Sequence, residues 1–396
     1  MNMNIGVFSY YYLPIINGVV LTIRDWKIYT QSKHHLIRVY VPNGSDKTND
    51  TDVSYFPAVP LYRRFGITVP MFPEGMIEKE IRLRKHTLLH VHHPHYIGQL
   101  AIFAKKKMGV PLIFTYHTRY ADYLRIYLPY ISIGVSHFIL TRGIVRFMNQ
   151  CDGVTVANDS LRDEIIRYGV RAPVYVVPPG VDTKFMSSGN RATTRRRFHY
   201  DVSDDVLLYV GRFAKEKNIY FLMKAFARIA KKNAHVRFLL CGQGLEENQL
   251  RRVAKQKHVD HLVQFATNET PQTIRHIYAA ADMFVYASKT ETYGRAIVEA
   301  MAAGLPIVAL RAVSVIDLLK DGITGRIVTR DSAALFSDVV LSLLRQKNVA
   351  HDIGEAAACD AREKYDNAVS GRMLLRVYKA VEDVYRQKRS DADMIR

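Results

Sequence analysis

The stretch 281–310 most constrains the fold, because it encodes a complete strand–helix–strand unit. The apolar run 281–287 has the length and the aromatic and β-branched content of a buried strand. A polar turn and a helix-compatible run over 296–303 follow, and a second apolar strand occupies 307–310. Because two strands joined through a helix form a parallel crossover, the sequence predicts an α/β fold with a parallel sheet.

Two carboxylates lie inside this unit. Glu291 is in the polar turn after the first strand, and Glu299 lies within the helix. Parallel sheets bind their ligands at the carboxyl ends of strands, and the start of a helix offers free amides to an anion. A ligand that carries both hydroxyls and negative charge, such as a sugar nucleotide, fits this combination.

The whole chain repeats the same alternation of strands and helices. Its 396 residues are too many for one ordinary core and suit two domains. The alternation stops at the proline-rich stretch 178–182 and restarts near 206. We therefore predict two Rossmann-like domains, 1–186 and 187–370, and a C-terminal segment 371–396. A cleft between such domains is the expected active site.

The charge of the chain indicates a polyanionic partner. The formal net charge is +19, and acidic residues are almost absent from 79–146. Nucleic acid and an anionic membrane both fit this charge, but no nucleic-acid-binding motif is present, so no nucleic-acid partner is expected. Tyrosine and arginine recur in 119–147, which is typical of an interfacial segment and equally of an aromatic core face with solvated arginines. The candidate acceptor and membrane residues here are Arg119, Tyr120, Tyr123, Arg125 and Tyr127.

Several common site types are not expected. His90, His92, His93 and His95 cluster in the sequence but fit no standard metal spacing, and no metal site is expected. The loop near Gly18 lacks a GxGxxG pattern, so no dinucleotide cofactor is expected. Because the N-terminal stretch lacks a charged leader and no apolar run is long enough to span a bilayer, we expect a cytoplasmic protein in peripheral contact with a membrane.

Three further residues follow strands where ligands collect. His117 comes directly after the apolar run 111–116, and a packing role is as consistent with this position as a functional one. Arg212 and Lys217 lie in the loop after the first strand of the second half. A guanidinium binds phosphate in a bidentate way and an ammonium acts as a point charge, so this loop suits a diphosphate.

Four motifs occur together in this chain. They are Gly211-Arg212 with Glu216-Lys217, Glu291 and Glu299 in an E-x7-E arrangement, the VPPGVD before the second domain, and AMAAGLP. In combination, they resemble the motifs of the retaining GT-B glycosyltransferases of family 4, and the resemblance covers nearly the whole chain. The resemblance implies two Rossmann-like domains facing a central cleft, with the nucleotide sugar held mainly by the second. It also implies a final helix that returns to the first domain, and no cofactor or catalytic metal.

The resemblance also implies a role for individual residues. It places Arg212, Lys217 and Gly18 at the donor diphosphate. The sugar would be held by Glu291, by the amides of Tyr293 and Gly294, and by His117. The ribose would be held by Glu299. The implied catalytic set is His117, Arg212, Lys217 and Glu291. Arg295 departs from the family pattern, which usually has an apolar residue there, and the resemblance gives its charge no role.

The segment FTYHTRYADYLRIYLPY is similar to one in the diacylglycerol glucosyltransferases of this family. We therefore predict transfer of a hexose, with UDP-glucose as the expected donor, to a membrane lipid such as 1,2-diacylglycerol, with retention at the anomeric carbon. Three alternatives stay open. They are a transferase acting on a polysaccharide or soluble acceptor, for example by mannosyl transfer, a phosphorylase on the same fold, and a basic nucleic-acid-binding protein.

Overall fold

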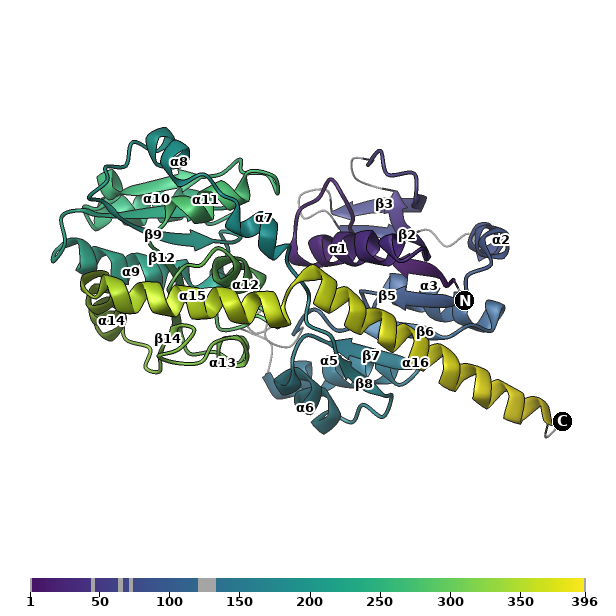
Figure 1. The fold of residues 1–396 in the computed structure, drawn as a ribbon. Helices are drawn as coiled ribbons and strands as arrows, with labels where there is room; N and C mark the ends of the chain where they lie inside the picture. The colour runs from purple at the N-terminus through teal and green to yellow at the C-terminus, as the bar shows by residue number, and fades with distance from the viewer. Residues whose placement is uncertain (1, 44–46, 63–66, 71–73, 120–132, 395–396) are drawn as a thin grey trace. The chain divides into compact units, whose positions relative to one another are not determined.

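The computed structural model describes residues 2–43, 47–62, 67–70, 74–119 and 133–394 (Figure 1). These residues form two compact units. Unit 1 contains the described residues up to Gly180 together with those from Asn367 onward, and unit 2 contains Val181–Asp366. The two boundaries between the units therefore lie a few residues before the boundaries at 186/187 and 370/371 that the sequence predicts.

Unit 1 is built on one eight-stranded sheet with the order β4-β3-β2-β1-β5-β6-β7-β8. All neighbouring strands are parallel except β3 and β4. The order reverses between β1 and β5, which makes their carboxyl ends the topological switch point where such sheets bind ligands. The strands are β1 Asn4–Phe8, β2 Leu36–Asn43, β3 Val53–Tyr62, β4 Ile67–Pro70, β5 Leu88–Val91, β6 Leu112–Thr115, β7 Gly153–Val156 and β8 Val174–Val176.

The antiparallel pair β3–β4 is not foreseen by the sequence. The arginines, aromatics and breakers of 61–72 predict an irregular surface segment, whereas two of its parts belong to strands. Prolines within a strand lack the N–H that a ladder needs, which makes such a run look like a loop. The register shifts between Pro60 and Tyr62, and such an irregularity is a place where a strand tolerates a proline.

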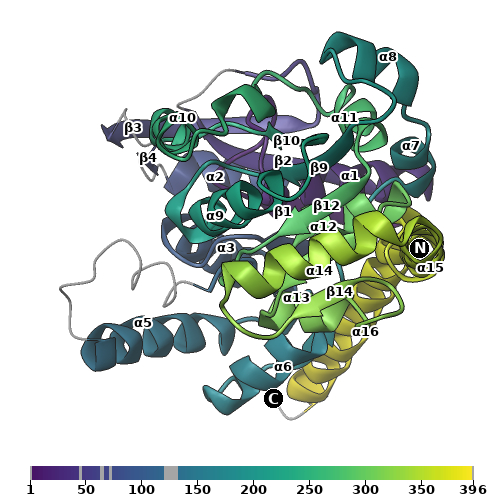
Figure 2. The same ribbon diagram turned by 90° about the vertical axis from the view of Figure 1, so that its left-hand side faces the viewer.

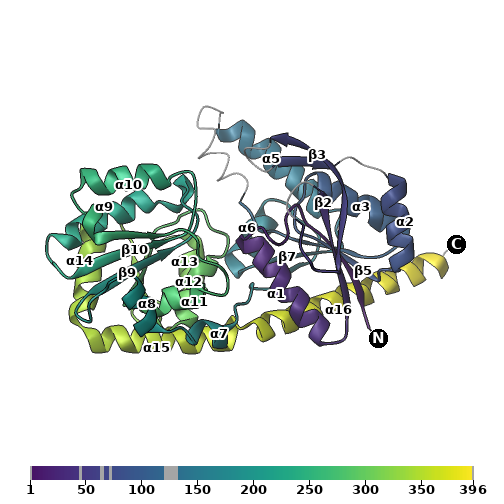
Figure 3. The same cartoon turned by 90° about the horizontal axis from the view of Figure 1, so that it is seen from above.

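Helices cover both faces of the unit 1 sheet. Figure 3 shows α1 and α16 on one side of the sheet and α3 and α5 on the other. In Figure 2, α3 lies between α2 and α5, and Phe147 of α5 is the nearest neighbour of Gly98 in α3. The helices are α1 Gly18–Ser32, α2 Glu74–Arg84, α3 Tyr96–Met108, α5 Ile133–Met148, α6 Asp159–Arg167 and α16 Asn367–Met394.

The C-terminal helix α16 is an integral part of unit 1. Trp26 of α1 donates from Nε1 to Ser370 Oγ at 2.8 Å. A Cβ added to Gly371 would lie 2.2 Å from the ring of Tyr29, so the two helices meet at van der Waals distance only because this residue is glycine. Further along α16, Leu374 and Tyr378 are buried in the same core as the strands of unit 1. The helix therefore completes a core whose other buried residues lie between Met3 and Val177.

Unit 2 has a six-stranded sheet with the order β11-β10-β9-β12-β13-β14, in which every pair is parallel. The strands are β9 Asp205–Val210, β10 Val236–Cys241, β11 Val263–Ala266, β12 Met283–Tyr286, β13 Ile307–Leu310 and β14 Arg326–Val328. The predicted crossover is confirmed, since β12 and β13 pair in parallel and α12 connects them. In this sheet the order reverses between β9 and β12.

Both faces of this second sheet also carry helices. Figure 3 shows α9 and α10 on one side of the sheet and α8, α11 and α12 on the other. The helices are α7 Thr183–Ser187, α8 Arg191–Arg197, α9 Ile219–Ala230, α10 Glu247–Gln256, α11 Ile274–Ala280, α12 Arg295–Ala302, α13 Val313–Leu318, α14 Ala333–Arg345 and α15 Lys347–Lys364. The predicted α/β fold with two parallel sheets is confirmed. In the described part of the chain, no helix has both the length and the apolar composition to cross a bilayer.

The contact between α1 and α16 gives a direct stability prediction. We expect Gly371→Ala to lower the free energy of unfolding of unit 1 by about 1–3 kcal/mol, because the new methyl group overlaps the Tyr29 ring. Urea denaturation followed by circular dichroism measures this.

Gly143→Ala in α5 is the matched control, because no described atom lies within 4 Å of a Cβ at that position. We expect this variant to be as stable as the wild type or up to about 1 kcal/mol more stable, since glycine disfavours a helix. Equal stability of the Gly371 and Gly143 variants would contradict the close packing of α1 against α16.

Candidate functional site

The switch point of unit 2 brings together the loops that follow β9 and β12. Asn218, at the end of the first loop, donates from Nδ2 to the carbonyl of Ala287 at 3.2 Å. Ser288 in the second loop donates its hydroxyl to the carbonyl of Glu216 at 3.2 Å. These two bonds hold the segments carrying the predicted phosphate-binding and sugar-binding residues against each other. The sequence gives Asn218 and Ser288 no such role, since both are ordinary polar loop residues.

Lys217 and Glu291 meet at this junction. The ammonium of Lys217 forms an ion pair with Glu291 Oε1, although the residues are 74 positions apart. The pKa of Lys217 is lowered to about 8, chiefly by burial and also by the positive charge of Arg212, while the charge of Glu216 opposes both effects. A buried ammonium needs a negative partner, and in this structure Glu291 is one. The same ammonium is suited to a phosphate that approaches the loop.

Arg212 is an exposed residue of the same loop. Its guanidinium forms an ion pair with Glu216 at 3.0 Å, and more than half of the Arg212 side chain is exposed. The carboxylate of Glu216 is fully buried. The ion pair with Glu216 therefore holds the arginine in place, while most of the Arg212 side chain stays accessible to a ligand.

Tyr293 and Gly294 form the entry to α12. Gly294 has φ 88° and ψ 51°, a left-handed conformation that glycine adopts without strain. Tyr293 is buried, with its ring 6.3 Å from that of Tyr365. The tyrosine ring thus fixes the loop, and the left-handed turn starts the helix. The first amides of a helix have no partner within it, which is the arrangement that binds anionic or polar groups.

Glu299 is held by two side chains. Arg295, one turn earlier in α12, donates from Nε to Glu299 Oε1 at 2.9 Å, and the hydroxyl of Tyr278 donates to Oε2 at 2.9 Å. This pairing explains the charge of Arg295, for which the sequence resemblance has no role. Carboxylate oxygens each accept more than one hydrogen bond, so Glu299 keeps capacity for a ligand. Tyr278 is a further residue that the sequence does not single out.

In unit 1, two predicted residues lie at the switch-point edge of the sheet. Gly18 is the first residue of α1, and no described atom lies within 4 Å of a Cβ built on it. Asn17 caps the helix by accepting from the Val20 amide at 2.9 Å. His117 lies two residues after β6, and its Nε2 is 2.7 Å from His92 Nδ1.

The histidines near this edge are engaged in hydrogen bonds. His90 uses both ring nitrogens, with the Tyr378 hydroxyl at 2.7 Å and Thr115 Oγ1 at 2.6 Å. Burial lowers the pKa of His90 to about 3, which keeps the ring neutral. Over the described residues, no group of three or more His, Cys, Asp or Glu side chains has an arrangement that holds a metal ion.

Of the candidate acceptor residues, only Arg119 lies within the described part of the chain. Its guanidinium forms an ion pair with Glu164 of α6, with Nε 3.3 Å from Oε1. Tyr168 also donates to Glu164 at 3.2 Å. Both charged side chains are largely buried, at 16% and 11% exposure. Arg119 thus has a structural partner inside unit 1. The other candidates, which lie outside the described residues, are Tyr120, Tyr123, Arg125 and Tyr127.

We predict that Arg119→Ala lowers the free energy of unfolding by about 1.5–3 kcal/mol, the range for a hydrogen bond to a charged group. Urea denaturation measures the loss. Arg162→Ala is the control, because Arg162 pairs only with exposed acids of its own helix among the ion pairs of the described residues. Its expected cost is below about 1 kcal/mol. Equal costs for the two variants would refute a structural role for the Arg119–Glu164 pair.

Comparison with known families decides what kind of protein this is. The family model Glycosyltransferase Family 4 matches residues 16–185, and the model Glycosyl transferases group 1 matches residues 190–359. Together the two matches span most of both units. The chain belongs to this glycosyltransferase family. Its residues at the switch point of unit 2 therefore lie in the part of the enzyme that the second model describes.

Individual relatives of this glycosyltransferase are consistent with that assignment. An alpha-monoglucosyldiacylglycerol synthase of Streptococcus pneumoniae is 29% identical over 78% of this chain and 71% of its own length. A synthase of the same name from Acholeplasma laidlawii is 28% identical over 82% and 84%. A GDP-mannose-dependent alpha-mannosyltransferase of Corynebacterium glutamicum is 24% identical over 82% and 76%.

Solved structures support the fold. Anabaena HepE in complex with UDP and glucose superposes with a TM-score of 0.77 at 18% sequence identity, over 96% of this chain and all of that one. At this identity the likeness concerns the fold alone. The predicted GT-B architecture, with two Rossmann-like domains, is thereby confirmed.

Proposed function

We propose that this glycosyltransferase moves a hexose, with glucose as the favoured sugar, from a nucleotide sugar such as UDP-glucose to a membrane lipid such as 1,2-diacylglycerol, with retention at the anomeric carbon. The contact of Lys217 with Glu291 at the switch point of unit 2 carries the donor part of the proposal. A cation and a carboxylate from two adjacent loops are the groups that a diphosphate and a sugar require.

The roles in the donor site follow from this arrangement. Arg212 and Lys217 bind the diphosphate. Glu291, with the amides of Tyr293 and Gly294, holds the sugar hydroxyls. In unit 1, Gly18 and His117 are the proposed contacts of the diphosphate and the sugar. The remaining role is that of Glu299, which accepts hydrogen bonds from the ribose while Arg295 and Tyr278 keep its carboxylate in place.

The chemistry proposed here uses positive charge on the leaving group. Breaking the anomeric bond leaves a nucleoside diphosphate and an oxocarbenium-like sugar, and fixed cations stabilise that transition state. Lys217 and Arg212 supply this charge from the chain itself, so the scheme requires neither a metal ion nor another cofactor. The acceptor attacks from the face that the phosphate leaves, and the departing phosphate takes the acceptor proton.

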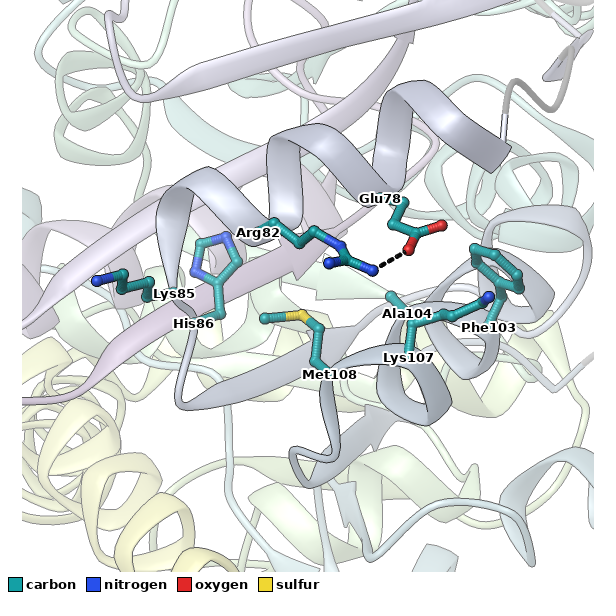
Figure 4. Close-up of a pocket in the computed structure, with 8 residues that line it drawn as sticks. All are labelled: Glu78, Arg82, Lys85, His86, Phe103, Ala104, Lys107 and Met108. Carbon is teal, nitrogen blue, oxygen red and sulfur yellow. Dashed lines mark hydrogen bonds and ion pairs between the residues drawn. The ribbon is translucent and has the colours of Figure 1, made fainter.

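Two observations support a lipid acceptor. The two synthases described above are named for a glucosylated diacylglycerol. In addition, unit 1 has a basic hollow of about 350 Å³ between α2 and α3, which Figure 4 shows. Arg82, Lys85 and Lys107 surround it, and Glu78 pairs with Arg82 at 2.5 Å. Each basic residue near an anionic bilayer contributes about 1 kcal/mol to attraction, so this face is our candidate for membrane contact.

A soluble acceptor is the second candidate. A relative named D-inositol 3-phosphate glycosyltransferase, from Segniliparus rotundus, is 26% identical over 75% of this chain, and its name gives a phosphorylated, water-soluble polyol. The mannosyltransferase of Corynebacterium glutamicum is named for GDP-mannose, which is the alternative donor. A screen of labelled nucleotide sugars, with product extracted into organic solvent, separates the two: label in the organic phase supports the lipid acceptor, and label confined to water supports the alternative.

The donor site predicts different effects for two substitutions. We expect Glu299→Ala to raise the donor KM by at least about tenfold, because ribose hydrogen bonds to a charged group contribute about 1.5–3 kcal/mol. We expect Arg212→Ala to lower kcat by about a hundredfold or more, since it removes charge from the leaving group. Initial rates at varied donor concentration measure both constants.

Lys255→Ala in α10 serves as the control, because Lys255 is exposed and lies outside the two loops of the proposed donor site. We expect wild-type constants for this variant. Near-wild-type constants for both Glu299→Ala and Arg212→Ala would refute the proposed donor site.

The basic hollow predicts how the protein binds membranes. Sedimentation with vesicles containing anionic lipid tests this. We expect Lys107→Glu to weaken vesicle binding at least about fivefold, since the substitution removes one attractive charge and adds a repulsive one. Lys255→Glu changes the net charge by the same amount and should bind like the wild type. Binding that is unaffected by salt, or equally weakened in both variants, would contradict membrane contact through this face.

A further inference from the structure

His92 and His117 are brought together by strand pairing. His92 is the first residue after β5, and His117 lies two residues after β6. The two strands are parallel neighbours, with Val91 opposite Phe114. Because their carboxyl ends lie at the same edge of the sheet, the residues that follow them face a common region. The sequence separation of 25 positions hides this proximity.

The two imidazole rings form a direct hydrogen bond. Nδ1 of His92 lies 2.7 Å from Nε2 of His117, and the ring planes are inclined by only 21°. Burial lowers the pKa of both rings well below the usual value, and the neighbouring histidines, His90 and His93, lower it further. Two neutral rings share one proton in such a bond, so the protonated nitrogen of one ring fixes the tautomer of the other.

His92 is itself held rigidly. Its side chain is almost fully buried, and its ring lies 4.3 Å from that of His90 and 6.0 Å from that of Trp26, measured between centroids. His90 is anchored in turn by Tyr378 of α16 and by Thr115, whose hydroxyl bonds to Thr155 at 2.5 Å. The core of unit 1 therefore determines where the Nδ1 atom of His92 lies.

We propose that His92 is a positioning residue that fixes the ring orientation and the tautomer of His117. The consequence for catalysis rests on the proposed function, in which His117 contacts the donor sugar. A sugar hydroxyl both donates and accepts, so a fixed tautomer gives the second nitrogen of His117 a single, defined role toward a ligand. Outer partners that orient a histidine in this way are common around metal-bound histidines, and here the same principle applies to a ligand contact.

The hydrogen bond itself is tested in the wild-type protein. Nuclear magnetic resonance of the full chain labelled with ¹⁵N-histidine should show a scalar coupling across the N–H···N bond and a single tautomer for His117. Signals are assigned with the variants His117→Gln and His92→Asn. Absence of the coupling, or a mixture of His117 tautomers, would overturn the proposal whether or not the protein transfers sugars.

Variants of His92 separate positioning from packing. His92→Phe keeps a ring but removes the hydrogen bond, whereas His92→Asn places an amide at the position of Nδ1. We expect a mixture of His117 tautomers and a fall in kcat of up to about a hundredfold in the phenylalanine variant, because small misplacements at a reacting centre cost this much. The asparagine variant should retain most of both properties.

His86→Phe is the matched control. His86 is also buried in unit 1, where it bonds to the Tyr40 hydroxyl at 2.7 Å, and its bonds in the structure do not include His117. It should lose stability and leave the His117 signal unchanged. Equal losses in His92→Phe and His92→Asn, or an unchanged His117 signal in His92→Phe, would overturn the proposal. Should no variant of the chain transfer sugars, the resonance signals still decide the positioning role.

Discussion

The arrangement of unit 2 depends on a pair of opposite charges at the switch point of its sheet. Lys217 is largely buried, and an unpaired ammonium there would be costly. Glu291 comes from the neighbouring loop and neutralises it. Because each group is the partner of the other, removing one leaves the second buried without compensation. In the proposed function, a donor diphosphate at Lys217 supplies a new counter-charge and leaves Glu291 available to the sugar. The same pair would thus both stabilise the folded loops and prepare the proposed donor site.

Unit 1 uses buried polar groups in a comparable way. The C-terminal helix α16 contributes Tyr378 to the core, and its hydroxyl bonds to His90. His90 packs against His92, which bonds to His117. Low dielectric strengthens such bonds and makes an unpaired member costly, so the network specifies one arrangement of its rings. The end of the chain is in this way linked to the edge of the sheet where ligands of parallel sheets bind.

The sequence predicts the parallel crossover around α12 because its apolar runs and stop signals are local. The positions of Glu291 and Glu299 follow from the same pattern. Arg295 and Glu299 are four positions apart, which is the spacing of an ion pair on one face of a helix. This ion pair explains why position 295 carries a charge. That signal is present in the sequence but is easily missed when the residue is compared only with a family pattern.

Other features depend on tertiary structure that local patterns do not contain. Asn218, Tyr278 and His92 act through partners that come from other segments of the chain. The β3–β4 hairpin contains prolines that argue against a strand unless the register shift is known. For Arg119, composition indicates a membrane-facing cation, whereas the structure adds a buried partner, Glu164. Charge counts show that a region is basic but do not show which of its cations are already paired.

The central claim is that the switch point of unit 2 binds the diphosphate of a nucleotide sugar. Hydrogen–deuterium exchange of the full chain, with and without UDP and with GDP in parallel, tests it most directly. If this site binds the donor, one nucleoside diphosphate slows exchange in 211–218 and 288–299, the segments that carry Lys217 and Glu291. Protection confined to unit 1, or no protection in these two loops with any nucleoside diphosphate, would contradict it.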